Sequence, residues 1–250
     1  MIAVYWAAKN FIFLFVLCFF CFINKRDKCS IGSILTPNPG IMILTKLAVF
    51  ASGRGSNFQT VHNKIQAGFI PAEINLLITD NDKAGAIQFA DENNIAVEII
   101  KPKEFPSPES FGEAILKPLN RYGINMIVLA GYLKKIPENV VEIFNNRILN
   151  IHPALLPAFG GKGMYGIRVH QAVYDSGAKI SGATVHLVNN EYDSGPIVLQ
   201  QAVEIDDCYS PEAIAGKVLA CEHQIFPEAI KRLVEQEYRI EGNRVIFIRN

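Results

Sequence analysis

The chain has 250 residues, half of them hydrophobic, so it can bury a sizeable core as one medium domain or two small ones. Residues 1–46 hold five Lys and Arg against one Asp, which leaves 19 basic and 23 acidic residues, a charge of −4, in residues 47–250. A mildly acidic body lacks the basic surface that binding to a phosphate backbone requires, which argues against a nucleic-acid partner.

Five cysteines occur, at positions 18, 21, 29, 208 and 221. Cys18 and Cys21 have the spacing of a redox or metal pair, but they lie in a phenylalanine-rich run without a second Cys/His pair nearby, so the indication of a metal site is weak. Cys208 and Cys221 are too few for a disulfide framework. The cysteine content therefore predicts a reducing compartment, the cytoplasm.

The N-terminal region contains a continuous apolar run of 13 residues, 11–23, between Lys9 and Lys25. A membrane-spanning helix needs about 20 apolar residues, and no small-residue cleavage site of a signal peptide follows the run. We therefore predict that residues 1–41 are an apolar extension outside the folded domain and that the working protein starts at Met42. The alternative is a membrane anchor, which requires that residues 11–23 are retained.

From Leu47 onward, short apolar strands alternate with helices, a spacing that predicts βαβ units and a mostly parallel sheet. The expected strands are 47–51, 74–79, 97–100, 126–130 and 148–152. Helices are expected after the first four of these strands: one ending near Ala67, one over 84–93, one entered at Pro106 and Pro108 and ending at Tyr122, and a short one between Pro137 and Phe144.

The C-terminal part has a different pattern. Residues 159–166 are rich in glycine and without apolar periodicity, which predicts a flexible loop before a helix over 169–176. Residues 180–188 and 197–203 alternate apolar and polar, which predicts an antiparallel pair around a long turn, 189–195. An amphipathic helix, 211–237, and a hairpin, 238–247, turning at Gly242 and Asn243, close the chain.

Together these elements predict an α/β fold: an open, mostly parallel, twisted sheet of the Rossmann-like kind, with helices on both faces and a C-terminal antiparallel hairpin. Residues 42–250 would form a single domain.

The segment 52–57, Ser-Gly-Arg-Gly-Ser-Asn, lies between a strand and a helix, where free backbone N–H groups and the helix dipole favour an anion. A dinucleotide-binding loop would need a third glycine where the chain has Phe58, and no Gly-Lys-Ser/Thr of a P-loop follows. We therefore expect one phosphate of a small substrate at this loop. The alternative is that Ser56 or Asn57 simply caps the helix.

Asn150 and His152 stand at the end of an apolar strand, immediately before Pro153. Residues i and i+2 of a strand point to the same face, so an amide donor and an imidazole that titrates near neutral pH project together. The spacing alone is equally compatible with a strand end that carries two polar residues into a turn.

Asp193 lies in the turn 189–195, where an ordinary solvated aspartate is the simplest explanation. Ligands of open α/β sheets gather beyond the carboxyl ends of the strands, where this turn, the 52–57 loop and His152 can converge. An amide and an imidazolium would stabilise the oxyanion of a tetrahedral intermediate, and the carboxylate would keep the imidazole charged. Because no serine or cysteine stands in a nucleophile motif, we expect direct transfer between two bound substrates.

The other titratable residues carry weaker hypotheses. His62 and His186 are expected to be structural or exposed. His170 is expected at the surface start of a helix, although a ligand could come close to it. Glu222 could recognise an amine, but a solvated face is the usual place for a helical glutamate.

Five motifs, taken together, resemble the folate-dependent phosphoribosylglycinamide formyltransferases of purine biosynthesis. They are Ser-Gly-Arg-Gly-Ser-Asn (52–57), Val-Leu-Ala-Gly-Tyr (128–132), Leu-Asn-Ile-His-Pro-Ala-Leu-Leu-Pro (149–157), Gly-Ala-Thr-Val-His (182–186) and Asp-Ser-Gly-Pro-Ile-Val-Leu-Gln (193–200). The resemblance runs from about Leu47 to the C-terminus. Residues 1–41 have no counterpart in it.

The resemblance implies transfer of a formyl group from the co-substrate 10-formyltetrahydrofolate to the amine of 5'-phosphoribosylglycinamide (GAR), without a metal and by a cytoplasmic monomer or homodimer. It implies that Asn150, His152 and Asp193 are catalytic. The residues implied to bind GAR are Gly55, Ser56, Asn57 and Glu222. The residues implied to lie beside the folate are Leu133, Lys134, Ile136 and Ile148, together with the backbone of the turn that holds Asn189, Asn190, Glu191 and Tyr192.

Three alternatives stay open. A formyltetrahydrofolate deformylase would use the same three residues with water as acceptor. It would carry an N-terminal regulatory domain, which the 46 largely apolar N-terminal residues cannot form, and the expected phosphate loop also argues against it. A transfer-RNA formyltransferase would carry a further C-terminal domain and a basic face. A non-catalytic folate or nucleotide binder, tethered to a membrane by residues 11–23, would not need the set of Asn150, His152 and Asp193.

Overall fold

A computed structural model of the chain describes residues 44–248, which form a nine-stranded sheet of order β3-β2-β1-β4-β5-β6-β7-β9-β8. Strands β1 to β5 run parallel to one another, β6 and β7 each run antiparallel to the strand before them, and β8 and β9 form a hairpin. The strands are β1 (Thr45–Phe50), β2 (Ala72–Thr79), β3 (Ala96–Ile99), β4 (Met126–Leu129), β5 (Ile148–His152), β6 (Ile180–Leu187), β7 (Ile197–Glu204), β8 (Tyr238–Glu241) and β9 (Arg244–Phe247).

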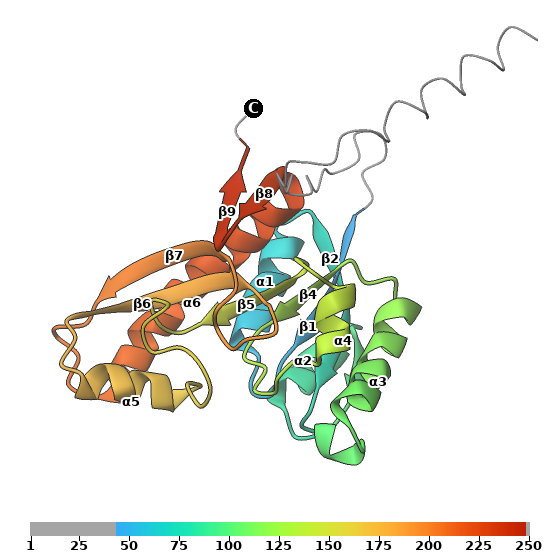
Figure 1. The fold of residues 1–250 in the computed structure, drawn as a ribbon, viewed down its shortest axis with the longest axis horizontal. Helices are drawn as coiled ribbons and strands as arrows, with labels where there is room; N and C mark the ends of the chain where they lie inside the picture. Colours follow the sequence, from blue (N-terminus) through green and yellow to red (C-terminus); the bar gives the residue numbers. More distant parts are fainter. Residues whose placement is uncertain (1–43, 249–250) are drawn as a thin grey trace, which may run out of the picture. The chain divides into compact units, whose positions relative to one another are not determined.

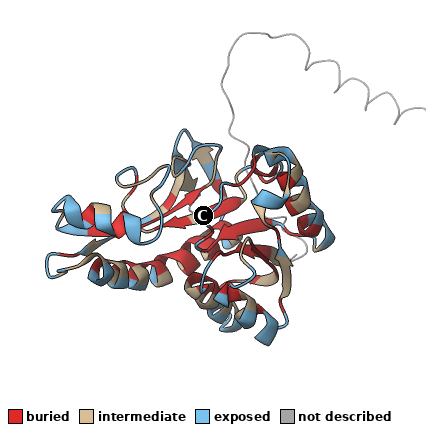
Figure 2. Ribbon diagram, turned by 90° about the horizontal axis from the view of Figure 1, so that it is seen from below, coloured by how far each residue is buried: buried red, intermediate tan, exposed pale blue. Residues whose placement is uncertain are grey.

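Helices cover both faces of this sheet (Figure 1). One hydrophobic cluster takes in the apolar sides of α1 (Ser56–Gln66), α2 (Gly85–Glu92), α5 (Ile167–Asp175) and α6 (Pro211–Glu235). A second takes in α3 (Pro108–Arg121) and α4 (Glu138–Ile143), which lie together at the right of Figure 1. Figure 2 shows the central strands buried and the outer sides of the helices exposed.

Strand β1 shows why a sheet covered on both faces needs continuous apolar strands. Leu47 and Val49 lie in the first cluster, whereas Ala48 and Phe50 lie in the second. Successive side chains of a strand point to opposite faces, so each of residues 47–50 is buried and apolar. The uninterrupted apolar run, which the sequence analysis used to predict a parallel sheet, follows from this burial.

The two longest helices begin at serines followed by proline. Ser107 caps α3 by accepting a hydrogen bond from the backbone N–H of Ser110, and Ser210 caps α6 by accepting one from the N–H of Ala213. Proline at the first helical position costs nothing, because the N–H that it lacks would have no partner there. These local signals fix where α6 starts and therefore which of its residues reach the sheet.

The order of the strands places a ligand site between β1 and β4. The chain builds outward from β1 through β2 to β3, then returns to the other side of β1 with β4 and β5. Such a reversal leaves a crevice at the carboxyl ends of the two central strands, where α/β proteins bind ligands. The backbone N–H of Ser52, after β1, donates to the carbonyl of Gly131, after β4, at 3.1 Å, so the two loops meet there.

The fold class predicted from the sequence is confirmed, including the C-terminal antiparallel hairpin. Element boundaries differ by a few residues: α5 begins at Ile167, and a short 3₁₀ helix, η1 (Pro102–Glu104), was not predicted. The apolar run 11–23 and the proposed start at Met42 lie outside the described residues. Within residues 44–248, none of the helices has the length and apolar character needed to cross a membrane.

Candidate active site

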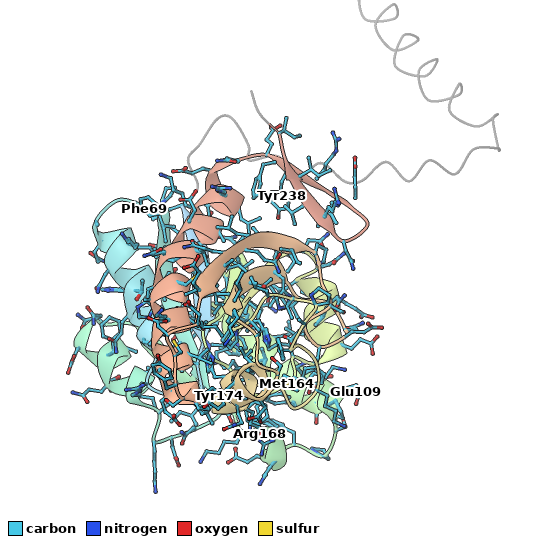
Figure 3. The ribbon with its side chains drawn as sticks, turned by 90° about the vertical axis from the view of Figure 1, so that its left-hand side faces the viewer. Phe69, Glu109, Met164, Arg168, Tyr174 and Tyr238 are labelled. Carbon is cyan, nitrogen blue, oxygen red and sulfur yellow. The ribbon has the colours of Figure 1, made fainter. Side chains whose placement is uncertain are left out.

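A cavity of about 460 Å³ lies at the carboxyl ends of the strands. The loops after β1, β4 and β5, the β6–β7 connection and α6 all contribute to its lining. The predicted site residues that line it are Gly55, Ser56, Asn57, Leu133, Lys134, Ile136, Asn150, His152, Asn189, Glu191, Tyr192, Asp193 and Glu222. Met164 also lines the cavity and lies in Figure 3 at the opposite end of the molecule from Tyr238 of β8, so the C-terminal hairpin stands apart from the site.

The predicted phosphate loop is shaped by Gly55, the residue before α1. Gly55 has φ 77°, in the left-handed region, and a Cβ added there would lie 2.9 Å from the Cβ of Ala86 in α2. The N–H of Ala86 donates to the carbonyl of Gly53 at 3.2 Å and holds α2 against the loop. No side chain caps α1, so the capping alternative for Ser56 and Asn57 is wrong and the first N–H groups of the helix are left to a ligand or water.

Asn150 of β5 is held by His186 of β6. The two residues are direct partners in the antiparallel register, and Nδ2 of Asn150 lies 3.0 Å from Nε2 of His186. Nδ1 of His186 lies 2.9 Å from the carbonyl of Leu187 and must donate to it, because a carbonyl can only accept. In the neutral imidazole the other nitrogen, Nε2, then carries no proton and accepts from the Asn150 amide. This bond fixes the orientation of the amide and uses one of its two hydrogens. The other remains for a ligand.

His152, at the end of β5, is only 3% exposed and has two partners. Its Nε2 donates to the carbonyl of Phe159 at 2.9 Å, and its Nδ1 lies 3.6 Å from Oδ2 of Asp193. Burial lowers the pKa of His152 and outweighs the opposing effects of the Asp193 charge and of the Phe159 carbonyl. The resting imidazole is therefore neutral at neutral pH, which corrects the expectation that Asp193 keeps it charged.

Asp193, in the β6–β7 connection, lies close to the imidazoles of His152 and His186. Its Oδ2 accepts from the N–H of Gly161 at 2.8 Å, and its Oδ1 lies 3.7 Å from Nε2 of His186. Burial raises the pKa of Asp193, but its polar neighbours His186 and His152 and the Gly161 N–H together outweigh burial and lower it. Asp193 is thus an ionised carboxylate at neutral pH.

The backbone around this cluster is tightly constrained. Asp193 has φ 53° and Phe159 has φ 54°, conformations that cost energy for residues other than glycine. A Cβ added at Gly160 would lie 2.5 Å from the Leu156 side chain and 3.2 Å from the Cβ of Asp193. Gly160 therefore allows the loop after β5 to approach Asp193. The two groups next to His152, the Phe159 carbonyl and the Asp193 carboxylate, both belong to residues with a strained backbone.

Glu222 of α6 lies at another part of the cavity wall, bound to Asn57 of α1. The Nδ2 of Asn57 donates to Oε2 of Glu222 at 2.6 Å. Burial raises the pKa of Glu222 to about 7, although the bond from Asn57 opposes that rise. The expectation of a solvated glutamate is wrong: Glu222 is buried and lines the cavity.

Two residues of the predicted folate set do not line the cavity. Ile148 is fully buried in the hydrophobic cluster of α3 and α4. It shares a face of β5 with His152, but four residues at about 3.3 Å each separate the two, so Ile148 lies too deep. The side chain of Asn190 donates to Glu138 at 3.0 Å instead of turning inward.

Two histidines were missed as site residues. His186 is 2% exposed and contacts both Asn150 and Asp193, so of the two expectations for it, structural or exposed, the exposed one is wrong. His170, expected at the surface, is buried against the cavity, where burial lowers its pKa. The register of the β5–β6 pair would have placed His186 opposite Asn150, but that register depends on a pairing between distant segments.

The chain is similar in sequence and in structure to proteins of one family. The sequence profile described as "Formyl transferase" matches residues 45–230, most of the chain and all of the cavity-lining residues named above. The chain belongs to the formyl transferase family.

Relatives of this formyl transferase carry a common description. The Arabidopsis thaliana protein named "Phosphoribosylglycinamide formyltransferase, chloroplastic" is 44% identical over 206 residues, covering 82% of this chain and 70% of the relative. The phosphoribosylglycinamide formyltransferase of Bacillus subtilis is 35% identical over 191 residues, covering 76% and 95%. The crystal structure of glycinamide ribonucleotide transformylase 1 from Symbiobacterium toebii superposes with a TM-score of 0.77 at 34% identity, covering 82% and 95%.

Proposed function

We propose that this formyl transferase moves a formyl group from 10-formyltetrahydrofolate to the amine of 5'-phosphoribosylglycinamide. The observation that carries the proposal is the meeting of Asn150, His152 and Asp193 in one cavity, although the chain separates Asp193 from His152 by a helix and a strand. The names of the relatives supply the acceptor and the transferred group, the resemblance of the sequence motifs supplies the folate donor, and the cavity offers places for both.

The reaction needs a proton acceptor and an oxyanion donor at the same point. The neutral amine of GAR attacks the formyl carbon and forms a tetrahedral intermediate, whose oxyanion accepts a hydrogen bond from the second N–H of the Asn150 amide. Nδ1 of neutral His152 accepts the proton that the amine loses, and Asp193, 3.6 Å away, stabilises the imidazolium. The same proton passes through water to the folate nitrogen as its bond to the formyl carbon breaks, which leaves formyl-GAR and tetrahydrofolate.

Both ends of the cavity suit this pair of substrates. Gly55, Ser56 and Asn57 at the start of α1 would hold the GAR phosphate on backbone N–H groups, and Glu222 would face its glycinamide end. The folate would lie against the loop after β4 and the β6–β7 connection. The cavity-lining residues proposed for it are Leu133, Lys134, Ile136, Asn189, Glu191 and Tyr192.

A formyl-transfer assay on the purified chain tests the proposal and separates it from a deformylase. With 10-formyltetrahydrofolate and GAR together, we expect formyl-GAR and tetrahydrofolate in equal amounts. With the folate alone, we expect no release of formate. Formate released at the same rate without GAR would identify water as the acceptor and overturn the proposal, and binding of both ligands without turnover would indicate a non-catalytic binder.

We infer a monomer or a homodimer in the cytoplasm as the working form. The reducing compartment indicated by the cysteine content supports the location, and light scattering at assay concentration tests the oligomeric state. Cell fractionation tests the compartment, and recovery of the chain in a plastid fraction would contradict the cytoplasmic assignment. The intact mass of the natural protein tests the start at Met42, which a chain retaining residues 1–41 would refute.

A further inference from the structure

A second polar cluster joins the phosphate loop to the loop proposed to face the folate. Oγ of Ser52, two residues after the end of β1, lies 2.5 Å from Oδ1 of Asp80, the residue after β2. The same Oγ accepts from the backbone N–H of Leu133 at 3.0 Å. Nζ of Lys134 lies 3.3 Å from Oδ2 of Asp80.

Asp80 and Lys134 differ in how far their side chains are buried. The side chain of Asp80 is 8% exposed, so its carboxylate depends on protein partners for the hydrogen bonds that water would otherwise supply. Ser52 donates to one oxygen and Lys134 pairs with the other. The Lys134 side chain is 44% exposed and reaches back from the cavity rim to this buried charge.

The directions of the hydrogen bonds show how the cluster connects Asp80 to the loop after β4. The Ser52 hydroxyl has one hydrogen, which goes to Asp80, so its oxygen is free to accept from Leu133. The adjacent backbone adds two further ties: the N–H of Ser52 donates to the carbonyl of Gly131, and Nδ2 of Asn81 donates to the carbonyl of Ser52 at 3.2 Å. Asp80 therefore holds Leu133 through Ser52 and Lys134 directly.

We propose that Asp80 and Ser52 are positioning residues for the folate-facing loop, and that Lys134 anchors this loop on Asp80 rather than binding the carboxylates of the donor. The inference rests on the proposed function and assigns this cluster a role in it. The buried carboxylate sets the conformation of residues 133–136, whose backbone and apolar side chains form one wall of the cavity.

The competing role for Lys134 predicts opposite results. If its ammonium bound the glutamate carboxylates of the donor, Lys134→Met would weaken only donors that carry this glutamate. Asp80→Asn would then release the ammonium for the ligand and lower the KM for such donors. If Lys134 is an anchor, both substitutions raise the KM for donors with and without the glutamate, because the wall that holds the ring system is displaced in either case.

The experiment compares the full-length wild-type chain, Asp80→Asn, Lys134→Met and the double variant, with 10-formyltetrahydrofolate and with the same donor lacking its glutamate. We expect each single variant to raise the KM for both donors about tenfold, the usual effect of losing a hydrogen bond to a charged group. We expect the KM for GAR to stay within about twofold and the double variant to be no worse than Asp80→Asn. Asp82→Asn is the matched control, since it removes the exposed pair with Lys101 in the same loop.

Several outcomes decide the proposal. A KM that changes only for the glutamate-bearing donor, or that falls in Asp80→Asn, overturns it, as do additive effects in the double variant. If Asp80→Asn does not fold, Lys134→Met alone with the two donors still decides between anchor and ligand. A wild-type chain without formyl transfer would refute the proposed function first, whereas an active wild type with unchanged Lys134→Met kinetics would refute only the anchor.

Discussion

Two carboxyl groups, the buried Glu222 and the half-buried Asp193, face the same cavity, and their surroundings move their pKa values in opposite directions. Glu222 has one polar partner, the amide of Asn57, and burial raises its pKa to about 7. Asp193 is also penalised by burial, but two imidazoles and the Gly161 N–H surround it and lower its pKa. The two carboxyl groups thus differ in how many polar groups gather around them: three around Asp193 and one at Glu222.

This difference assigns separate tasks to the two groups. A carboxylate that stays charged can stabilise a positive charge as it forms on His152, 3.6 Å away. A carboxyl group that titrates near neutral pH can exchange its proton when an amine or hydroxyl of a substrate binds. Pairs of titratable groups with pKa values pushed apart are typical of active sites, and the predictions below test each half of the pair.

The largest effect is expected from Asp193→Asn. The substitution keeps the shape but removes the charge that stabilises the His152 imidazolium, so turnover should fall by about 10²–10⁴, the range of general acid–base catalysis. Steady-state formyl-transfer kinetics measure this, with the KM for both substrates little changed. Asp175→Asn, at the exposed end of α5, serves as the control, and turnover like that of the wild type in Asp193→Asn would refute the assignment.

Asn150→Ala removes the proposed oxyanion donor. We expect turnover to fall by about 10²–10³, or about 2.7–4 kcal/mol of transition-state stabilisation. The same kinetics should show an equal loss in kcat and kcat/KM, because the bond strengthens only in the transition state. A variant that raises the KM but keeps kcat would show that Asn150 binds substrate without acting on the intermediate.

Glu222→Gln should change how stability depends on pH. The folded-state pKa, about 7, lies above the unfolded value of 4.5, so the protonated group stabilises the fold at low pH and this contribution, about 3 kcal/mol, is lost as pH rises from 4.5 through 7. Urea unfolding at pH 5 and pH 8 should show that loss in the wild type but not in Glu222→Gln. Glu212→Gln, exposed in the first turn of the same helix, should behave like the wild type, and identical profiles for all three chains would contradict the buried titration.

The smallest effect is expected from His186→Ala. Removing the acceptor for Nδ2 of Asn150 frees the amide to rotate, which should lower kcat about tenfold, the scale of one hydrogen bond. The KM values should stay near those of the wild type. If kcat does not change, then the bond between the two strands does not position the amide.

Sequence reasoning reached the fold and two of the catalytic candidates because they depend on short-range patterns. Strand–helix alternation predicts the parallel sheet, and the spacing of Asn150 and His152 places both side chains on one face of β5. Asp193 has no local signature, because turn aspartates are common. It was reached from the expected convergence of loops at the carboxyl ends of the strands and from the family resemblance.

The features that were missed depend on contacts between distant segments. His186 faces Asn150 only because β6 pairs with β5 in one particular register. Glu222 is buried because α6 packs against α1, and the periodicity of a long helix does not tell which helix covers which residue. The charge of His152 depends on the sum of burial and of the Asp193 field, and the sequence gives no measure of either.

Selective ¹³C labelling of carboxyl groups, with NMR titration from pH 2 to pH 9, tests the comparison of Asp193 and Glu222 most directly. Asp193→Asn and Glu222→Gln identify the two signals by their loss. We expect the Asp193 signal to titrate below 3.8, the ordinary aspartate value, and the Glu222 signal to titrate near 7. Two signals that both titrate near 4 would contradict the account.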